Sequence, residues 1–228
     1  MDNRPYTTLF MLSSIDGKIS TGSTDKLDVD KDFPHIEGLR EGLQQYYDIE
    51  ANTDMWSCCS GRTQVKIGVN ERELCDKHSD VSFMIIDNHH LNEHGVRYLS
   101  SKVKNLVIVT TNEDHIALRI SGLDNVDILL QEKLDLRQAL EFIYKEYDCD
   151  RLTIQTGGML NSLFLRSNLI DSLNIVIAPA LIGGVNTPTL IDGDSLEDES
   201  ELSLIKAFIL KDCKVLNNSY IQLKYEKR

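Results

Sequence analysis

The stretch that most constrains the fold runs over residues 151–192. It opens with a β-type run at residues 152–155, which stops at a Gly-Gly pair, and apolar residues then recur at helical spacing until Asn168. A second apolar run, residues 173–178, leads to another Gly-Gly pair. This order predicts a strand, a glycine turn, a helix and a second strand, which together form one βαβ unit.

Gly157 and Gly158 stand where the first strand of this unit meets its helix. Glycine lets backbone approach a ligand closely, and a helix start offers unpaired N–H groups at the positive end of its dipole. Such a turn suits a phosphate or a pyrophosphate. The motif is neither G-x-G-x-x-G nor a Walker loop, however, and close packing of the helix on its strand explains the glycines equally well.

Size and charge limit the class of protein. A chain of 228 residues with 41% hydrophobic content buries one sizeable core, so we expect one domain over residues 1–228. The net charge of -12 argues against nucleic acid and against an anionic membrane as partners.

No apolar run reaches transmembrane length, and the first residues lack a signal-peptide core. The five cysteines are odd in number and form no C-x-x-C pair, which favours reduced thiols in a cytoplasmic protein.

The N-terminal segment predicts a first strand with polar groups at its end. The apolar and β-branched run at residues 6–12 leads into S-S-I-D-G-K-I, where Asp16-Gly17 marks a turn. Ligands of open α/β sheets bind at the carboxyl ends of strands, so Ser13, Ser14 and Asp16 are candidate site residues. A simple hairpin is the alternative. Residues 20–34 have little periodicity and predict a loop that can serve as a lid.

A second strand-to-glycine turn follows a helix predicted over residues 36–49. The short strand at residues 55–59 ends in S-G-R-T-Q-V-K-I-G, in which Arg62, Thr63 and Lys66 are groups that can hold phosphate. A solvated loop with ordinary surface charges is the plainer interpretation of the same residues.

His90 and His94 raise the question of a metal. They are four residues apart and would share a helix face, as paired zinc ligands do. Gly95 follows at once, and no third ligand is evident, although zinc needs at least three protein ligands. We therefore predict a polar surface loop and no metal site.

The remaining pattern completes the architecture. Strands are predicted at residues 83–87, 106–111 and 126–130, and Asp135 is the expected N-cap of the helix that leads into residue 152. Two alternating runs, residues 208–216 and 219–225, predict an antiparallel hairpin. The fold class is α/β, as a three-layer single domain with a mixed, mostly parallel sheet and a C-terminal antiparallel hairpin.

Two motifs resemble one family, the pyrimidine reductases of riboflavin biosynthesis, which share the dihydrofolate reductase fold. The run L-S-S-I-D-G-K-I at residues 12–19 is similar to their S-L-D-G-K-I/T strand end. L-I-D-S-L at residues 169–173 and I-A-P-A-L-I-G-G at residues 177–184 resemble their L-I-D-E-L and I-A-P-x-L-I/L-G-G signature. The resemblance covers nearly the whole chain from Tyr6 to the final hairpin. We expect no counterpart of the zinc deaminase domain found in bifunctional members.

The resemblance implies hydride transfer from NADPH, with a ribosylaminopyrimidine phosphate reduced to its ribitylamino product by a homodimer. It places Asp16, the candidate catalytic residue, and Gly17 beside the nicotinamide. The cofactor-binding residues that we expect are Gly17, Arg62, Thr63, Lys66, Gly157, Gly158, Met159 and Leu160, with Arg62, Thr63 and Lys66 available for a 2′-phosphate. We expect Gly158→Val to weaken cofactor binding more than it lowers folding stability.

The expected substrate-binding residues are Ser13, Ser14, Arg40 and Gln155. Gln155 stands where the family has an acidic residue before its glycine turn. After Thr63 the family usually has V-x-A-D-D-P, whereas this chain has Q-V-K-I-G.

Three classes of function are compatible with the residues. The first is an NADPH-dependent reductase of a small nitrogen heterocycle, with the riboflavin intermediate as the first candidate, dihydrofolate as the second, and another carbonyl or imine as a further possibility. The second is a non-catalytic nucleotide or pyrimidine binder. The third is a hydrolase or transferase with a metal at His90 and His94.

Overall fold

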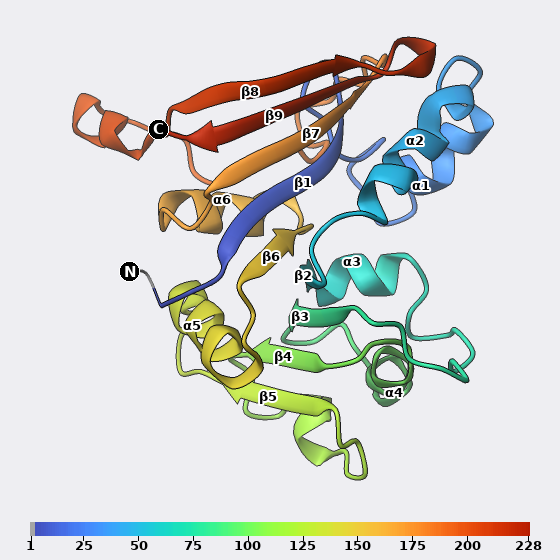
Figure 1. Ribbon diagram of the computed structural model, residues 1–228, viewed down its shortest axis with the longest axis vertical. Coiled ribbons are helices and arrows are strands. Elements are labelled where there is room, and N and C mark those ends of the chain that lie inside the picture. Colours follow the sequence, from blue (N-terminus) through green and yellow to red (C-terminus); the bar gives the residue numbers. More distant parts are fainter. Residues whose placement is uncertain (1–2) are drawn as a thin grey trace. The chain divides into compact units, whose positions relative to one another are not determined.

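The computed structural model describes residues 3–228, and the chain forms two compact units (Figure 1). The first unit contains the chain up to Tyr6 together with Asp54–Thr156. The second unit contains Thr7–Thr53 and Gly157–Arg228. Each unit is therefore built from segments that are distant in the sequence.

The first unit has a parallel sheet with strand order β5-β4-β3-β2-β6. Its strands are β2 (Trp56–Ser60), β3 (Ser82–Ile86), β4 (Leu106–Thr110), β5 (Val126–Leu130) and β6 (Arg151–Ile154). Every residue of β4 is buried, as a near-continuous apolar run in a parallel sheet requires when both faces are covered.

Polar side chains cap the N-termini of the α-helices in this unit. They are α3 (Gly61–Lys66), α4 (Glu93–Lys102) and α5 (Leu136–Tyr147), with a 3-10 turn at Ile116–Arg119. The side chains of Ser60, Asn92 and Asp135 each accept a hydrogen bond from a backbone N–H of the first helical turn, which confirms the predicted cap at Asp135. The α4 helix packs its apolar side chains into one cluster with β3 and β4, formed by residues that include Ile85, Val96, Leu99, Leu106 and Ile108.

The second unit has the strand order β1-β7-β9-β8. Its strands are β1 (Tyr6–Ser14, of which Tyr6 belongs to the first unit), β7 (Ser172–Ala178), β8 (Phe208–Val215) and β9 (Ile221–Lys227). β1 pairs with β7 in parallel, whereas β9 pairs antiparallel with both β7 and β8. The C-terminal hairpin is thus β8 and β9, as predicted.

The second unit has three α-helices, of which the first two contribute to an aromatic core. The three helices are α1 (Val29–Asp32), α2 (Arg40–Glu50) and α6 (Gly158–Arg166), with 3-10 turns at Phe33–His35, Glu199–Leu204 and Asn217–Ser219. The rings of Phe10 and Tyr46 stack with centroids 5.0 Å apart, and the fully buried Tyr220 donates its hydroxyl to the carbonyl of Leu39. The first strand, α2 and the hairpin turn are joined in this core.

The predicted fold class, α/β with a mixed, mostly parallel sheet and a C-terminal antiparallel hairpin, is confirmed. Three local predictions were wrong in part. The predicted loop at residues 20–34 contains α1, because the Asp28 carboxylate caps its first turn and Val29 is buried. The predicted turn at residues 60–68 contains the helix α3, because Ser60 supplies an N-cap. The helix expected from residue 36 begins at Arg40.

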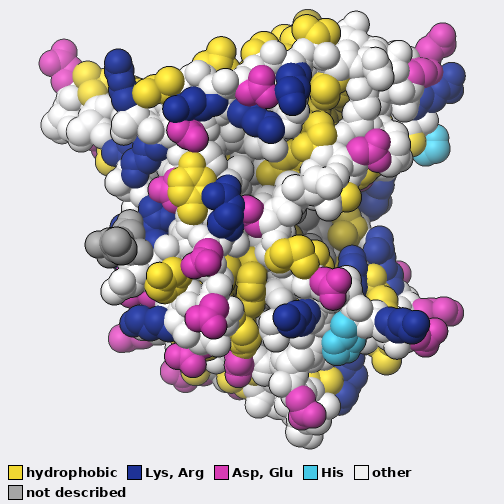
Figure 2. Space-filling view, in the orientation of Figure 1, with side chains coloured by type: hydrophobic (Ala, Val, Ile, Leu, Met, Phe, Trp, Pro, Cys, Tyr) yellow, Lys and Arg dark blue, Asp and Glu magenta, His cyan; other side chains and the backbone are white. Residues whose placement is uncertain are grey.

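The surface carries both signs of charge. Figure 2 shows acidic and basic side chains interspersed over the face in view. Among residues 3–228, no helix combines the length and the apolar character that crossing a membrane would need.

Candidate functional site

The polar residues at the end of β1 bond to one another. The hydroxyl of Ser13 donates to the carbonyl of Ser14 at 3.0 Å, and the hydroxyl of Ser14 donates to the Asp16 carboxylate at 2.5 Å. The N–H of Lys18 donates to the Ser14 hydroxyl at 2.9 Å, and Gly17 closes the turn with a φ of 78°. Both serines are buried. The hydroxyls that we expected to face substrate are therefore engaged within the turn.

The Asp16 carboxylate binds the segment that follows β7. It accepts the N–H of Ile182 at 3.1 Å and the N–H of Gly183 at 2.6 Å. The hydrogen bond from the Ser14 hydroxyl and those from the Gly183 and Ile182 amides lower the pKa of Asp16 to about 2. Asp16 is thus ionised at neutral pH, which suits an anchoring role and does not suit a proton donor.

Lys18 binds the same segment. Its ammonium donates to the carbonyl of Gly184 at 2.8 Å and to the carbonyl of Thr187 at 2.9 Å. The sequence places Lys18 two residues after Asp16, so the turn carries both signs of charge. The Asp16 carboxylate thus accepts hydrogen bonds from amide N–H groups, and the Lys18 ammonium donates hydrogen bonds to carbonyl oxygens, of one short stretch of chain.

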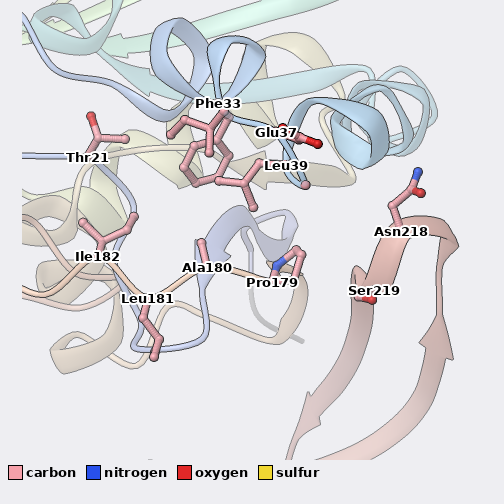
Figure 3. Close-up of a pocket in the computed structure, with 12 residues that line it drawn as sticks. Thr21, Phe33, Glu37, Leu39, Pro179, Ala180, Leu181, Ile182, Asn218 and Ser219 are labelled. Carbon is pink, nitrogen blue, oxygen red and sulfur yellow. The ribbon is translucent and has the colours of Figure 1, made fainter.

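A cavity of about 580 Å³ lies in the second unit, next to this stretch. Phe33 and Leu39 face Pro179 and Ala180 across it (Figure 3). Its lining residues are Thr21, Phe33, Ile36, Glu37, Gly38, Leu39, Pro179, Ala180, Leu181, Ile182, Asn218 and Ser219. The volume and the mainly apolar walls are typical of a small-molecule site. No local sequence pattern reveals this cavity, because its walls come from three segments that are distant in the chain.

Arg40 does not line the cavity, although we predicted it as a substrate-binding residue. Its guanidinium is more than half exposed and pairs with Glu41, with 2.7 Å between Nε and Oε1. The structure therefore gives Arg40 a surface ion pair at the start of α2.

The two glycines before α6 differ in their surroundings. A Cβ at Gly158 would overlap the carbonyl oxygen of Thr189 and the carboxylate of Asp192. A Cβ at Gly157 would meet no atom within 4 Å. Neither glycine has a positive φ. Close packing within the chain thus explains Gly158 without a ligand, and the expected effect of Gly158→Val on cofactor binding stays a prediction. Gly157 remains open to a ligand.

The other residues predicted at this turn are partly accessible. Met159 is 63% exposed, and Leu160 is half-buried. In the first unit, Gln155 is held on β2, because its side-chain oxygen accepts the hydroxyl of Ser57 at 2.9 Å. That contact fixes the end of β6 against the neighbouring strand.

The residues predicted to hold phosphate in the first unit lie on α3. The hydroxyls of Ser60 and Thr63 are 2.8 Å apart, and the N–H of Thr63 donates to the Ser60 hydroxyl at 3.1 Å. Arg62 is exposed and Lys66 is half-buried, one helical turn apart. The two cations and the hydroxyl of Thr63 are therefore displayed on one short helix, whereas we had expected a glycine turn.

A buried carboxylate that sequence analysis did not identify follows β3. The Asp87 side chain is fully buried and accepts hydrogen bonds from the N–H of Leu91 at 3.0 Å and from His115 Nε2 at 3.0 Å. His90 contributes its N–H and its Nδ1, the latter at 2.9 Å. Burial alone would raise the pKa of Asp87. The hydrogen bonds from His115, Leu91 and His90 outweigh this effect and hold the pKa of Asp87 well below its usual range. A carboxylate directly after an apolar strand was the available signal.

The two histidines considered for a metal are engaged separately. His90 lies before α4 and binds Asp87, while Nε2 of His94 lies 2.7 Å from the carbonyl of Arg72. Because α4 begins at Glu93, the two histidines do not share a helix face. Over residues 3–228, no three His, Cys, Asp or Glu side chains are arranged to hold a metal ion.

Polar groups at the carboxyl ends of parallel strands lie where ligands bind in α/β proteins. The model of one family, the RibD C-terminal domain, matches residues 5–220, and the chain belongs to that family. The resemblance to the riboflavin-biosynthesis reductases is thereby confirmed.

Two curated relatives are named 2,5-diamino-6-ribosylamino-4(3H)-pyrimidinone 5′-phosphate reductase. The protein of Archaeoglobus fulgidus is 26% identical over 208 residues, which are 89% of this chain and 93% of the relative. The protein of Methanothermobacter thermautotrophicus is 23% identical over 214 residues, which are 91% of this chain and 94% of the relative.

Solved structures share the fold. Acinetobacter baumannii RibD has a TM-score of 0.68 at 19% identity, with 99% of this chain and 59% of that chain covered. The riboflavin biosynthesis reductase of Saccharomyces cerevisiae has a TM-score of 0.60 at 16% identity, with 99% and 91% covered. This chain therefore spans 59% of the length of the A. baumannii protein and nearly all of the yeast one.

Proposed function

We propose that this chain is a reductase of riboflavin biosynthesis that acts on 2,5-diamino-6-ribosylamino-4(3H)-pyrimidinone 5′-phosphate. The observation that carries this proposal is the family match over residues 5–220, together with two relatives of that name that align over nearly their whole length. The family match runs through segments of both units, which supports the proposal that residues 1–228 form a single reductase domain.

The reaction needs little acid or base from side chains. A bound nicotinamide cofactor would supply the hydride to the sugar carbon, and a proton taken up from solvent would balance the reduction, while the protein supplies orientation and a closed site. The apolar walls of the cavity, Phe33, Leu39 and Pro179 among them, suit that task. The ionised Asp16 is assigned to holding the site in place, and the reacting sugar carbon requires no proton from it.

We propose NADPH as the cofactor, with Arg62, Thr63 and Lys66 in contact with its 2′-phosphate. Their cations and hydroxyl lie on α3, directly after the carboxyl end of β2. A phosphate could also approach the backbone at Gly157, which precedes the first residue of α6. A Cβ at this position would meet no atom within 4 Å, so the backbone is accessible.

Fluorescence titration tests the cofactor assignment. We expect NADPH to bind about tenfold or more tightly than NADH, since one charge-assisted contact contributes about 1.5–3 kcal/mol. The double variant Arg62→Met and Lys66→Met should lose that preference while NADH affinity stays the same. Equal affinity of the natural chain for both cofactors would exclude this phosphate-binding role of α3.

Turnover assays test the substrate. Purified protein is mixed with NADPH and either the ribosylaminopyrimidinone phosphate or dihydrofolate, and absorbance at the nicotinamide band is followed. We expect oxidation of NADPH with the first substrate alone. A protein that binds NADPH and reduces neither compound would be assigned to a different carbonyl or imine substrate, or to a non-catalytic binding role.

We also propose a homodimer in the cytoplasm. The edge strand of the second unit, β8, exposes apolar side chains that a second copy would cover, with Ile209 at 45%, Leu210 at 51% and Val215 at 81% exposure. All five cysteines lie in the described part of the chain and form no disulfide there, which is compatible with reducing conditions. Light scattering at micromolar concentration should give twice the chain mass of 25.9 kDa, and the monomer mass would contradict the dimer.

A further inference from the structure

The turn after β1 and the segment that follows β7 are joined by opposite charges. The Asp16 carboxylate accepts the amides of Ile182 and Gly183 at 3.1 and 2.6 Å. Next along the segment, the Lys18 ammonium donates to the carbonyls of Gly184 and Thr187 at 2.8 and 2.9 Å. The two side chains thus bind consecutive donors and acceptors of a stretch that has no regular secondary structure of its own.

Backbone bonds add to this junction at both ends. The N–H of Ile15 donates to the carbonyl of Ala180 at 2.9 Å, and the N–H of Ile19 donates to the carbonyl of Pro188 at 3.0 Å. Gly183 and Gly184 have φ values of 71° and 84°. A pair of glycines in this conformation does not hold its shape without external contacts, because glycine has the largest backbone freedom of any residue. Asp16 and Lys18 supply those contacts.

The anchored segment forms one side of the cavity. Pro179, Ala180 and Ile182 lie on that side, opposite Phe33 and Leu39 (Figure 3). A shift of the segment would therefore change the width of the cavity directly. The Asp16 contacts at Ile182 and Gly183 lie at the end of this lining stretch, where they set its position.

The cavity lining favours an uncharged occupant. None of its lining residues is Lys, Arg or His, and Glu37 is the one charged residue among them. A lining that has no cation and carries the carboxylate of Glu37 disfavours the phosphate of a substrate in this cavity. A flat ring with amino groups suits it better, because apolar residues can cover its faces and the lining residues Glu37, Thr21 and Asn218 carry oxygen acceptors.

We infer that Asp16 and Lys18 are positioning residues that hold the 179–187 segment as one wall of this cavity, and that the cavity takes the uncharged aminopyrimidinone ring of the substrate. The inference rests on the proposed function for the identity of the ring. Neither side chain contacts the reacting atoms in this assignment. Their effect is on how well the ring is held, and so on KM, with kcat unchanged.

Two variants remove the anchors in different ways. In Asp16→Asn, the amide nitrogen of the new side chain is a donor and faces the backbone N–H of Gly183, so one contact is replaced by a repulsive one. Lys18→Met removes the ammonium and keeps much of the length of the side chain. Lys18→Arg keeps the charge and can donate to two carbonyls, so it should rescue. Asp194→Asn makes the same change of net charge at an exposed position and is the matched control.

The first measurement needs no ligand. Hydrogen exchange at the amides of Ile182 and Gly183 should be about tenfold faster in Asp16→Asn than in the natural chain, because their acceptor is lost. Exchange in Asp194→Asn should match the natural chain. Unchanged protection of these amides in Asp16→Asn would overturn the anchoring role.

The second measurement uses the ring without its phosphate. The nucleoside 2,5-diamino-6-ribosylamino-4(3H)-pyrimidinone should bind the natural chain in calorimetry, and its Kd should rise about tenfold in Asp16→Asn and in Lys18→Met. Ala180→Leu, which places extra volume in the cavity, should abolish binding. No binding by the natural chain, or full binding by Ala180→Leu, would overturn the assignment of the ring to this cavity.

Kinetics separate positioning from chemistry. With the phosphorylated substrate, both anchor variants should raise KM about tenfold and leave kcat within about twofold, and Lys18→Arg should restore KM. A fall in kcat at constant KM would make Asp16 part of the chemistry and overturn its positioning role. A natural chain that binds the nucleoside but reduces no substrate would contradict the proposed function, while the binding result would still support the cavity.

Discussion

Asp87 and Asp16 make an instructive pair, because each follows the carboxyl end of a parallel strand in its own unit. Asp87 comes directly after β3, and Asp16 lies in the turn after β1. Each accepts hydrogen bonds from a segment distant in the sequence, and these bonds hold both pKa values below the ordinary range. The Asp87 side chain is fully buried, whereas Asp16 is exposed.

The difference shows what burial adds to the same chemistry. Around Asp87, the donors of Leu91 and His115 have no water to replace their partner, so the carboxylate is part of the folded core. Around Asp16, solvent can take over when the carboxylate is lost. We therefore expect Asp87 to determine global stability and Asp16 to determine the local position of one segment.

The largest expected effect is that of Asp87→Asn. The variant should lose about 3 kcal/mol or more of unfolding free energy, because breaking one side of a buried charged cluster leaves its partners unsatisfied. The amide group of the new side chain can accept fewer hydrogen bonds and brings donors of its own next to His115 and His90. Urea denaturation measures the change in unfolding free energy.

Asp114→Asn is the control for that variant. Asp114 forms an exposed ion pair with Arg119, and such pairs contribute about 0–1 kcal/mol. If Asp87→Asn proved as mild as Asp114→Asn, the contrast between the buried and the exposed carboxylate would fail.

The two glycines that follow β6 extend the comparison to a third strand end, where we expect a change in stability of intermediate size. Gly158→Ala should cost about 1–3 kcal/mol, because its Cβ would overlap Thr189 and Asp192 and the packed segment must move. Gly157→Ala should change stability by less than about 0.5 kcal/mol, because its Cβ meets nothing within 4 Å and its φ of -77° suits alanine. Thermal melting of the two variants tests whether packing alone separates these neighbouring glycines.

The smallest expected effect is the loss of the Asp16 contribution to stability at acidic pH. Its pKa is about 2 in the folded chain and 3.8 for the ordinary group, so its contribution to stability is present above pH 3.8 and is lost as the pH falls towards 2. The difference in Tm between the natural chain and Asp16→Asn should therefore be greatest above pH 3.8 and should disappear as the pH falls below about 2. A difference that stays constant over this range would show that the hydrogen bonds do not depend on ionisation.

Several elements were predictable because their signals are local. The fully buried strand β4, the capped helix α5 and the final hairpin follow from apolar runs, a capping aspartate and alternating residues. The errors also have local causes. The turn expected at residues 60–68 is α3, because the N-cap at Ser60 outweighs the helix-breaking tendency of Gly61.

The candidate site was predicted less well than the fold. Ser13, Ser14 and Asp16 were correctly placed at the end of the first strand, yet their bonds to one another and to the segment after β7 were not foreseen. Arg40 was expected near substrate because its helix resembles a stretch of the family, and the ion pair that it forms with Glu41 on the surface was not foreseen.

By itself, the sequence determined the fold class, the order of the main elements and the membership in a family, because periodicity and turn motifs are written in contiguous residues. Only the tertiary structure decided that Gly158 is needed for packing, that Asp87 is buried and that Asp16 is an anchor. Each of these properties depends on a partner far along the chain, such as Gly183 for Asp16, 167 residues away. Contacts of that kind arise from strand pairing and close packing, and no pattern in neighbouring residues encodes them.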